Sequence, residues 1–306
     1  LKLKPLKISR FGASMVGTSA DPPSPKRCGT KRQREAGPNS YFWLNDIALE
    51  RATRIKSVAS SSCTARTRVA AVSISKFANM PLNLPETLPG EQPECWNLNR
   101  YMDILPNPET RVAIDSSSSS SSSGYINANF LHGFDGNARS YIATQGPLET
   151  TISDFWQMVW EQESKAIVML TGLHENGMKK CERYWPEDVG ENHAVTYGSF
   201  EVTLKAVEER GAYHHHLLHL RRSDEEKCRQ IDHFWYNTWP DHSAPADVGG
   251  VIQLLRHVRE AVSNSDTTPL VVHCSAGIGR TGAFLVIDIG EQHLCSGSDD
   301  SLDILD

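Results

Sequence analysis

The sequence predicts one α/β (α+β) domain, a twisted mixed β-sheet flanked by helices, behind a separate N-terminal segment. From about residue 86, short apolar runs of strand length alternate with amphipathic helical segments, which is typical of a sheet packed against helices. In residues 1–85, the apolar residues recur at no regular spacing. Residues 1–80 hold 15 Lys and Arg against 4 Asp and Glu, and residues 81–306 hold 16 against 33. We therefore expect a basic, disordered tail over 1–85 and the folded domain over 86–306.

The first elements of the domain follow from periodicity. Residues 140–147 alternate and end on Gly-Pro, which predicts a strand that runs into a turn. Apolar residues at helical spacing predict a helix over 150–164, and the apolar run at 166–171 has the length of a buried strand. The eight serines at 116–123 predict a flexible surface loop.

The later elements alternate in the same way. Apolar residues at helical spacing over 251–262 predict a second amphipathic helix, with Asp247 near its start. Residues 270–273 predict a short strand, and residues 281–294 predict a mostly apolar helix behind a loop that contains glycine.

Composition excludes several classes of protein. With 39% hydrophobic and 22% charged residues, the chain has the composition of a globular protein with one good-sized core. No 18-residue apolar window occurs, and the first ten residues lack a continuous apolar segment, so neither membrane insertion nor a secretory leader is expected. The net charge of −17 over residues 81–306 argues against nucleic-acid binding, because it would repel a phosphate backbone.

The cysteines indicate a reducing compartment. Their number, seven, is odd, and they are widely spaced without a CxxC pair, which argues against a disulfide framework or a zinc cluster. We therefore expect a cytoplasmic protein. A basic cluster at residues 26–34 leaves two interpretations open for the tail: a patch that binds an acidic partner or directs nuclear entry, and a solvated stretch without a partner.

The segment 271–282, VVHCSAGIGRTG, combines a nucleophile with an anion site. A strand delivers Cys274 to a loop of small residues, followed by Arg280 and a helix. Two glycines let successive backbone N–H groups turn inward as an anion-binding nest, and the N-terminus of the helix adds positive potential. Arg280 can grip two oxygens of a tetrahedral oxyanion. The same surroundings favour the thiolate form of Cys274, which is placed to attack phosphorus.

This segment resembles the HCxxGxxR signature of the protein tyrosine phosphatases, and the chain is similar to their non-receptor-like catalytic domains. The resemblance covers about residues 95 to 295, and the family's other motifs appear in the expected order. They are YINAN at 125–129, ATQGP at 143–147, DFW at 154–156, Lys180-Cys181 with YWP at 184–186, and WPD at 239–241.

The resemblance implies a role for each matching residue. Cys274 is expected to form a phosphocysteine intermediate, and Asp241, on a segment that resembles the family's mobile lid, to protonate the leaving phenolate. Thr281 would offer its hydroxyl to the thiolate, and His273 would help to keep the cysteine in that form. The phosphoryl oxygens are expected to be bound by Arg280 and by the N–H groups of Ser275, Ala276, Gly277, Ile278 and Gly279.

The resemblance also implies phosphotyrosine-containing proteins as substrates. Tyr101 matches the residue that forms one wall of a deep cleft, which only phosphotyrosine is long enough to enter, and Asp103 matches a position that binds the substrate backbone. Glu175 and Lys180 match a loop that supports the lid and the signature arginine, with a surface ion pair as the alternative interpretation. No metal or organic cofactor is expected.

Three departures from the family pattern qualify this interpretation. Met102 stands where relatives often carry a basic residue, which predicts weaker attraction to acidic peptides, and Ser243 stands where the lid usually has glycine, which predicts slower lid closure. The family's glutamine motif and last helices do not follow Arg280, so we expect a C-terminally truncated domain. A catalytically impaired phosphatase that binds phosphotyrosine therefore stays open as the alternative function.

A histidine cluster adds a second open question. His214, His215, His216 and His219 lie close together, and the first and third share one strand face. Metal binding is one interpretation. The other is a strand over 213–220, as in the family fold, because no acidic or cysteine partner stands nearby.

Overall fold

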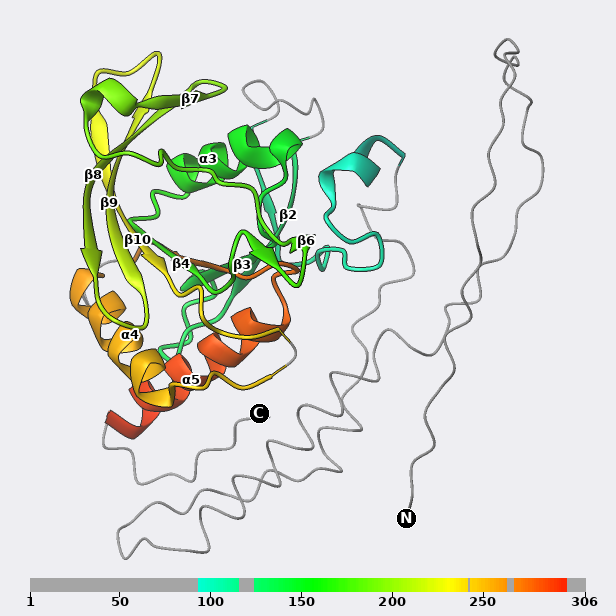
Figure 1. The fold of residues 1–306 in the computed structure, drawn as a ribbon. Helices are drawn as coiled ribbons and strands as arrows, with labels where there is room; N and C mark the ends of the chain where they lie inside the picture. The colour runs from blue at the N-terminus through cyan, green and yellow to red at the C-terminus, as the bar shows by residue number, and fades with distance from the viewer. Residues whose placement is uncertain (1–92, 116–123, 242, 263–266, 296–306) are drawn as a thin grey trace, which may run out of the picture. The chain divides into compact units, whose positions relative to one another are not determined.

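The computed structural model describes residues 93–115, 124–241, 243–262 and 267–295. In this part of the chain, a nine-stranded sheet has the order β1-β2-β3-β11-β4-β10-β9-β8-β7, and β5 and β6 form a separate hairpin (Figure 1). The predicted tail over 1–85 and the serine run at 116–123 lie outside the described residues. The predicted α/β class is confirmed.

The elements follow one another in mixed order. The strands are β1 (Arg111–Ala113), β2 (Tyr125–Leu131), β3 (Tyr141–Thr144), β4 (Ala166–Met169), β5 (His174–Glu175), β6 (Met178–Lys179), β7 (Val195–Tyr197), β8 (Phe200–Glu209), β9 (His214–Arg222), β10 (Cys228–Trp235) and β11 (Leu270–His273). The α-helices are α3 (Ile152–Glu161), α4 (Val248–Ala261) and α5 (Gly279–Cys295), and the 3-10 helices are η2 (Pro93–Leu98), η3 (Glu149–Thr151) and η4 (Glu191–His193).

The centre of the sheet is parallel and its flanks are antiparallel. β11 pairs in parallel with β3 on one side and with β4 on the other, and β4 pairs in parallel with β10. All four residues of β11 are buried, and so are all four of β4. Continuous apolar runs of this kind are expected where helices cover both faces of a sheet.

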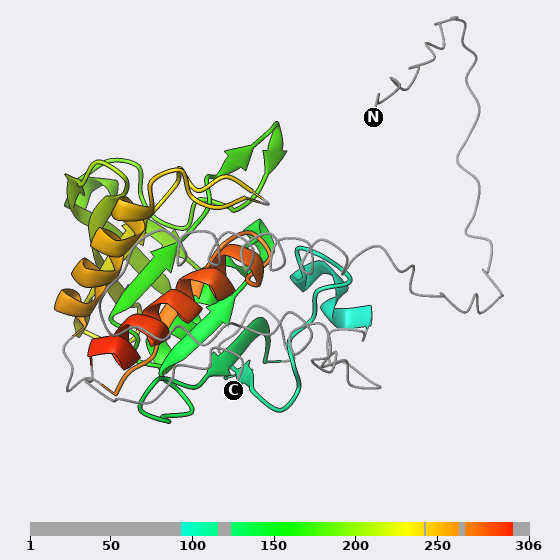
Figure 2. The ribbon, with the colours of Figure 1, turned by 90° about the horizontal axis from the view of Figure 1, so that it is seen from below.

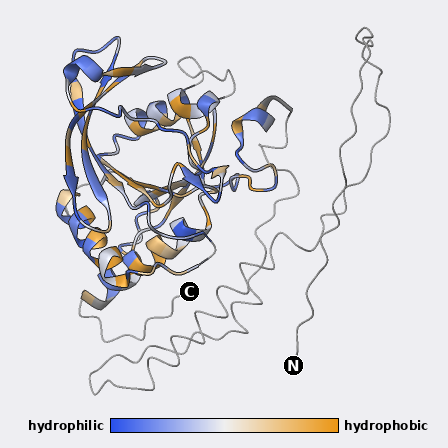
Figure 3. Ribbon diagram, in the orientation of Figure 1, coloured by the Kyte–Doolittle hydropathy of each residue, from blue (hydrophilic) through white to orange (hydrophobic). Residues whose placement is uncertain are grey.

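Each face of the sheet has its own core. Ile167, Met169 and Val271 point to the side that α3 covers, and they pack in one cluster with Phe155 and Trp156. On the opposite face, a second cluster combines Val168, Leu170 and Val272 of the sheet with Leu254, Leu255 and Val258 of α4 and Phe284 and Leu285 of α5. Figure 2 shows α5 running along this face beside α4. Hydrophobic and hydrophilic residues alternate along α3 and α4, as expected of helices with one buried side (Figure 3).

Helix boundaries follow from local contacts. Asp247 caps α4, because its side chain accepts a hydrogen bond from the Gly250 amide at 2.9 Å. The helix predicted over 150–164 starts with the 3-10 turn η3 and ends at Glu161, two residues before Glu163 takes a positive φ of 53°. α5 begins at Gly279, two residues before the predicted start. None of the described helices combines the length and apolar character needed to cross a membrane.

A buried carboxylate ties α4 and α5 to the sheet. Asp288 of α5 accepts hydrogen bonds from Arg259 of α4, with Nε at 2.9 Å and an Nη at 2.7 Å, and from the Tyr141 hydroxyl of β3 at 2.6 Å. Gln292 donates a further bond at 3.0 Å. This cluster fixes the helix whose first residues belong to the signature loop.

We predict that Arg259→Met lowers the free energy of unfolding by about 2 kcal/mol, because it leaves the Asp288 carboxylate buried without its cation. Urea denaturation measures the loss. The double variant Arg259→Met, Asp288→Asn should lose less, since residue 288 then carries no charge; an equal loss in both variants would contradict the explanation.

Candidate active site

The signature segment lies at the centre of the sheet. β11 ends at His273, the next five residues form a loop, and α5 starts at Gly279. Cys274, at the end of β11, has only 3% of its surface exposed. The sequence thus places the thiol where a buried parallel strand meets a helix N-terminus, which is a position that favours anions.

The loop is fixed through its carbonyl groups, which leaves its amides available. The Leu170 amide donates to the His273 carbonyl at 2.8 Å, and the Gly146 amide donates to the Ser275 carbonyl at 2.9 Å. The N–H groups of residues 275–279 donate to no acceptor among the described residues. Gly277 takes a φ of +79°, a conformation that glycine adopts readily. Unpaired consecutive amides next to a helix N-terminus form an anion-binding nest.

Arg280 is held beside this loop by a carboxylate and a carbonyl. One Nη donates to Glu175 Oε1 at 2.6 Å and to the Trp239 carbonyl at 2.9 Å, and the other lies 3.3 Å from Glu175 Oε2. Burial alone lowers the pKa of Arg280, but its hydrogen bond to Glu175 and the nearby charges of Cys274, Glu175 and Asp241 outweigh it, so the pKa is raised. The guanidinium therefore stays charged.

Asp241 lies against the same arginine. Its Oδ1 is 3.5 Å from an Nη of Arg280, and its Oδ2 is 2.7 Å from Lys180 Nζ. Burial lowers the pKa of Lys180, but the hydrogen bond and charge of Asp241 outweigh it and raise the pKa. The Lys180–Asp241 and Arg280–Glu175 pairs are largely buried, so neither is the surface ion pair that was the alternative interpretation.

Ser243 is tied to the start of the segment that carries Asp241. Its carbonyl accepts a hydrogen bond from Trp239 Nε1 at 2.9 Å. Slower lid closure caused by serine at this position stays a prediction.

Tyr101 contacts the signature loop through its hydroxyl. The Ser275 hydroxyl donates to the Lys180 carbonyl at 2.9 Å, so the Tyr101 hydroxyl, 2.9 Å away, donates to Ser275 Oγ. Met102 and Asp103 follow it and are exposed. The structure thus brings Tyr101 to the signature loop, whereas Asp103, two residues later, lies at the surface.

Two residues that the sequence did not single out hold the segment that carries Tyr101. Arg100 donates to the carbonyls of Gly146 and Pro147 at 2.9 and 2.6 Å. Gln145 accepts from the Arg100 amide at 2.8 Å and donates to the Leu98 carbonyl at 2.8 Å. Gln145 belongs to the motif at 143–147 and Arg100 precedes Tyr101, but the two residues are 45 positions apart in sequence and no spacing rule connects them.

His273 is fully buried and contacts Tyr184. Its Nδ1 lies 3.0 Å from the Cys274 carbonyl, and its Nε2 lies 2.7 Å from the Tyr184 hydroxyl. Burial lowers the pKa of His273 to about 4, so the ring is neutral at neutral pH. The Thr281 hydroxyl is buried and has no hydrogen-bond partner among the described residues, so the expected contact with Cys274 is not made here.

The histidine cluster is not arranged as a metal site. The described residues contain no group of three or more His, Cys, Asp or Glu side chains that could hold a metal ion. His214 and His216 do share a face of β9, as predicted, and their rings stack with centroids 6.2 Å apart.

Comparison with known proteins agrees with this geometry. A sequence model described as protein-tyrosine phosphatase matches residues 96–306. The tyrosine-protein phosphatase non-receptor type 7 of Homo sapiens is 41% identical over 222 residues, which cover 72% of this chain and 59% of that protein. The receptor-type tyrosine-protein phosphatase R of Mus musculus is also 41% identical over 222 residues, 72% of this chain and 33% of that protein.

The chain belongs to the protein-tyrosine phosphatase family. The rat non-receptor type 7 protein is 40% identical over 221 residues, and the alignment covers 59% of its length. The chain thus spans less than two thirds of these relatives.

We predict that Gly277→Ala disrupts the phosphatase signature loop, because a Cβ there would lie 2.4 Å from the Thr144 carbonyl oxygen. Gly136→Ala is the matched control, since Gly136 has nearly the same φ, +78°, and open space around it. Both variants should lose about 1 kcal/mol of stability from backbone strain, and Gly277→Ala should lose more because of the contact with Thr144. Gly277→Ala alone should also lose about tenfold or more in vanadate affinity, measured by calorimetry; equal affinity in both would contradict the steric argument.

Proposed function

We propose that this chain hydrolyses phosphotyrosine in proteins through a phosphocysteine intermediate. The observation that carries the proposal is the arrangement at the end of β11. A buried Cys274 is followed by five backbone amides without an acceptor among the described residues and by the charged Arg280. These groups are suited to bind the three equatorial oxygens of a phosphoryl group in front of a sulfur nucleophile.

In the first step, the Cys274 sulfur attacks phosphorus and a P–S bond forms as the P–O bond to the tyrosine breaks. The leaving phenolate takes a proton from Asp241, which supports catalysis because phenolate is a poor leaving group near neutral pH. Its position supports the assignment of Asp241 as the acid, since its Oδ1 lies 3.5 Å from an Nη of Arg280, the proposed phosphate-binding arginine.

In the second step, water attacks the phosphocysteine and the P–S bond breaks, which releases inorganic phosphate and the thiolate. Asp241, now deprotonated, accepts a proton from the water. All of the electrostatic stabilisation comes from side chains and backbone dipoles of this chain, so the reaction as proposed uses no cofactor.

The position of Tyr101 supports phosphotyrosine as the substrate. Its hydroxyl is bonded to Ser275, and the preceding Arg100 donates to the carbonyls of residues 146 and 147, so the aromatic side chain is held at the signature loop. A phosphorylated tyrosine ring can stack on it. The names of the relatives, all tyrosine phosphatases, support the same class. The five free cysteines among the described residues fit a reducing compartment, and we propose the cytoplasm.

We predict that Asp241→Asn lowers kcat for phenyl phosphate by a factor of about 10² to 10³, because the leaving group then departs without a proton. Dinitrophenyl phosphate needs no such proton, so its hydrolysis should fall far less. Cys274→Ser should abolish turnover of both esters. Similar losses on the two esters in Asp241→Asn would contradict the role of the acid.

The time course of the same assay separates turnover from capture. Sustained release of phenol by the chain supports hydrolysis. A burst of about one phenol per protein, absent in Cys274→Ser, would instead favour the alternative function of phosphotyrosine binding. No release at all would overturn the proposal.

Met102 generates a prediction about peptide preference. It is 57% exposed and adjoins Tyr101, so a charge there would act on residues that flank the phosphotyrosine. Met102→Lys should raise kcat/KM for peptides with acidic flanks by about fivefold, equivalent to about 1 kcal/mol, and leave matched neutral peptides unchanged. A strong acidic preference in the unaltered chain would contradict the hypothesis.

A further inference from the structure

Four buried side chains form one hydrogen-bonded series that ends at the signature loop. It runs from His216 on β9 to His233 on β10, then to Tyr184 and to His273 on β11. The His216 and His233 Nδ1 atoms are 3.0 Å apart. The Tyr184 hydroxyl lies 2.8 Å from His233 Nε2 and 2.7 Å from His273 Nε2.

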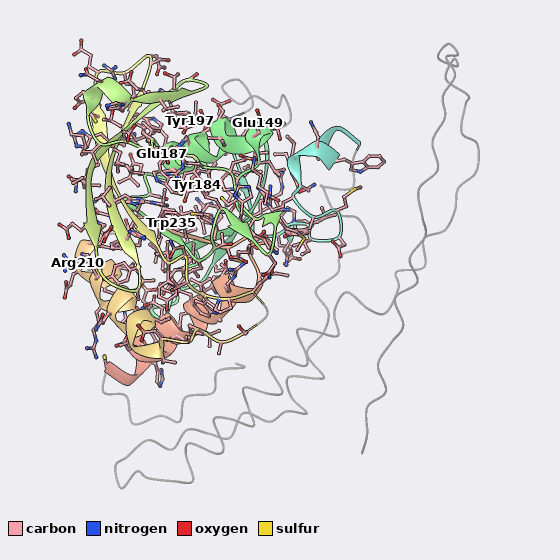
Figure 4. The ribbon with its side chains drawn as sticks, viewed as in Figure 1. Glu149, Tyr184, Glu187, Tyr197, Arg210 and Trp235 are labelled. Carbon is pink, nitrogen blue, oxygen red and sulfur yellow. The ribbon has the colours of Figure 1, made fainter. Side chains whose placement is uncertain are left out.

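Tyr184 spans the strand between the two histidines it contacts. β4 lies between β10 and β11, and the tyrosine hydroxyl passes 3.7 Å from the sulfur of Met169 on that strand. The ring of Phe155 from α3 packs against Tyr184 with centroids 4.7 Å apart, and Trp156 Nε1 donates to the Tyr184 carbonyl at 2.9 Å. Figure 4 shows Tyr184 in the interior, between α3 and the sheet. The hydroxyl is therefore held in the buried core.

The position of each proton in the series follows from the contact between His273 and the Cys274 carbonyl. The Cys274 carbonyl can only accept, so His273 carries its hydrogen on Nδ1 and donates it at 3.0 Å. A neutral His273 then has a bare Nε2, to which the Tyr184 hydroxyl donates. The Tyr184 oxygen accepts from His233 Nε2–H, and the bare Nδ1 of His233 accepts from His216 Nδ1–H. Every donor in the series meets an acceptor.

The rings must be neutral for this assignment, and burial makes them so. It lowers the pKa of His216 to about 4 and that of His233 well below the ordinary histidine value, with neighbouring histidines and Arg183 acting in the same direction. His216 is 4% exposed and His233 is fully buried.

If the donors and acceptors of the series are reversed, one contact is left without a hydrogen. If His233 carried its hydrogen on Nδ1, its bare Nε2 and that of His273 would both face the Tyr184 oxygen, which has a single hydrogen to donate. Two lone pairs would then meet within 2.8 Å in the core. If Tyr184 turned its hydrogen to His233, His273 would have to move its own to Nε2, and the Cys274 carbonyl would lose its donor.

We propose that His216 and His233 are positioning residues for the signature loop: through Tyr184 they hold His273 in the tautomer that donates to the Cys274 carbonyl. The proposal deepens the proposed function and rests on it for its catalytic consequence. The tautomers themselves do not depend on activity. A histidine pair two and three strands away from β11 thus sets the orientation of the peptide group at the nucleophile.

Nitrogen-15 NMR of the histidine rings in the unaltered chain tests the tautomers directly. We expect His273 and His216 to carry hydrogen on Nδ1 and His233 on Nε2, all three neutral at pH 7. A His273 protonated on Nε2 would overturn the proposal even in an active enzyme. The expected tautomers in a chain without phosphatase activity would instead leave the series intact and refute the proposed function.

Two variants of the outer histidine test the effect on catalysis. His216→Leu removes the donor, and we expect a mixture of His273 tautomers together with a loss of about fivefold in kcat/KM, the factor equivalent to one net hydrogen bond. His216→Asn keeps an N–H donor near the Nδ1 position and should restore both. His219→Leu, on the same strand and outside the series, should change neither. Equal kinetics in His216→Leu and His219→Leu would refute the positioning role.

Discussion

Hydrogen bonds to the carbonyl groups of residues 273–275 are the interaction on which the site depends. Each of these carbonyls accepts from a different part of the fold: the Leu170 amide after β4, the His273 ring and the Gly146 amide after β3. With the carbonyls fixed outward, the amides of the following residues have no protein acceptor in the described part of the chain. The sheet thus stabilises the loop and leaves the N–H groups of the loop without a protein acceptor. A loop of this kind can bind an anion without rearrangement.

The site contains two buried cations although the domain around it is negatively charged overall. Residues 81–306 carry an excess of 17 acidic groups, yet the site holds two cations, Arg280 and Lys180, in largely buried contacts. Each is paired with a carboxylate, which keeps it ionised in a poorly solvated place. In the proposed reaction, an arriving phosphate dianion meets cations that are already oriented and whose partners, Glu175 and Asp241, hold their side chains in position.

The sequence predicts the parts of the site that are local and misses those that are not. Strand, loop and helix over 270–294 are contiguous, so one segment was enough to predict their order. The partners of Arg100, Tyr184 and His216 lie 45, 89 and 17 residues away, and a hydrogen bond across that distance depends on the finished sheet.

The order of strands has a consequence for how the protein is made. β11 fills the space between β3 and β4, although it follows both of them in the chain. During synthesis the two earlier strands emerge first and have no neighbour to separate them until residues 270–273 leave the ribosome. Until then their apolar edges stay open to wrong pairing. Non-local closure of this kind is slow, and it waits for β11, the strand that leads into Cys274.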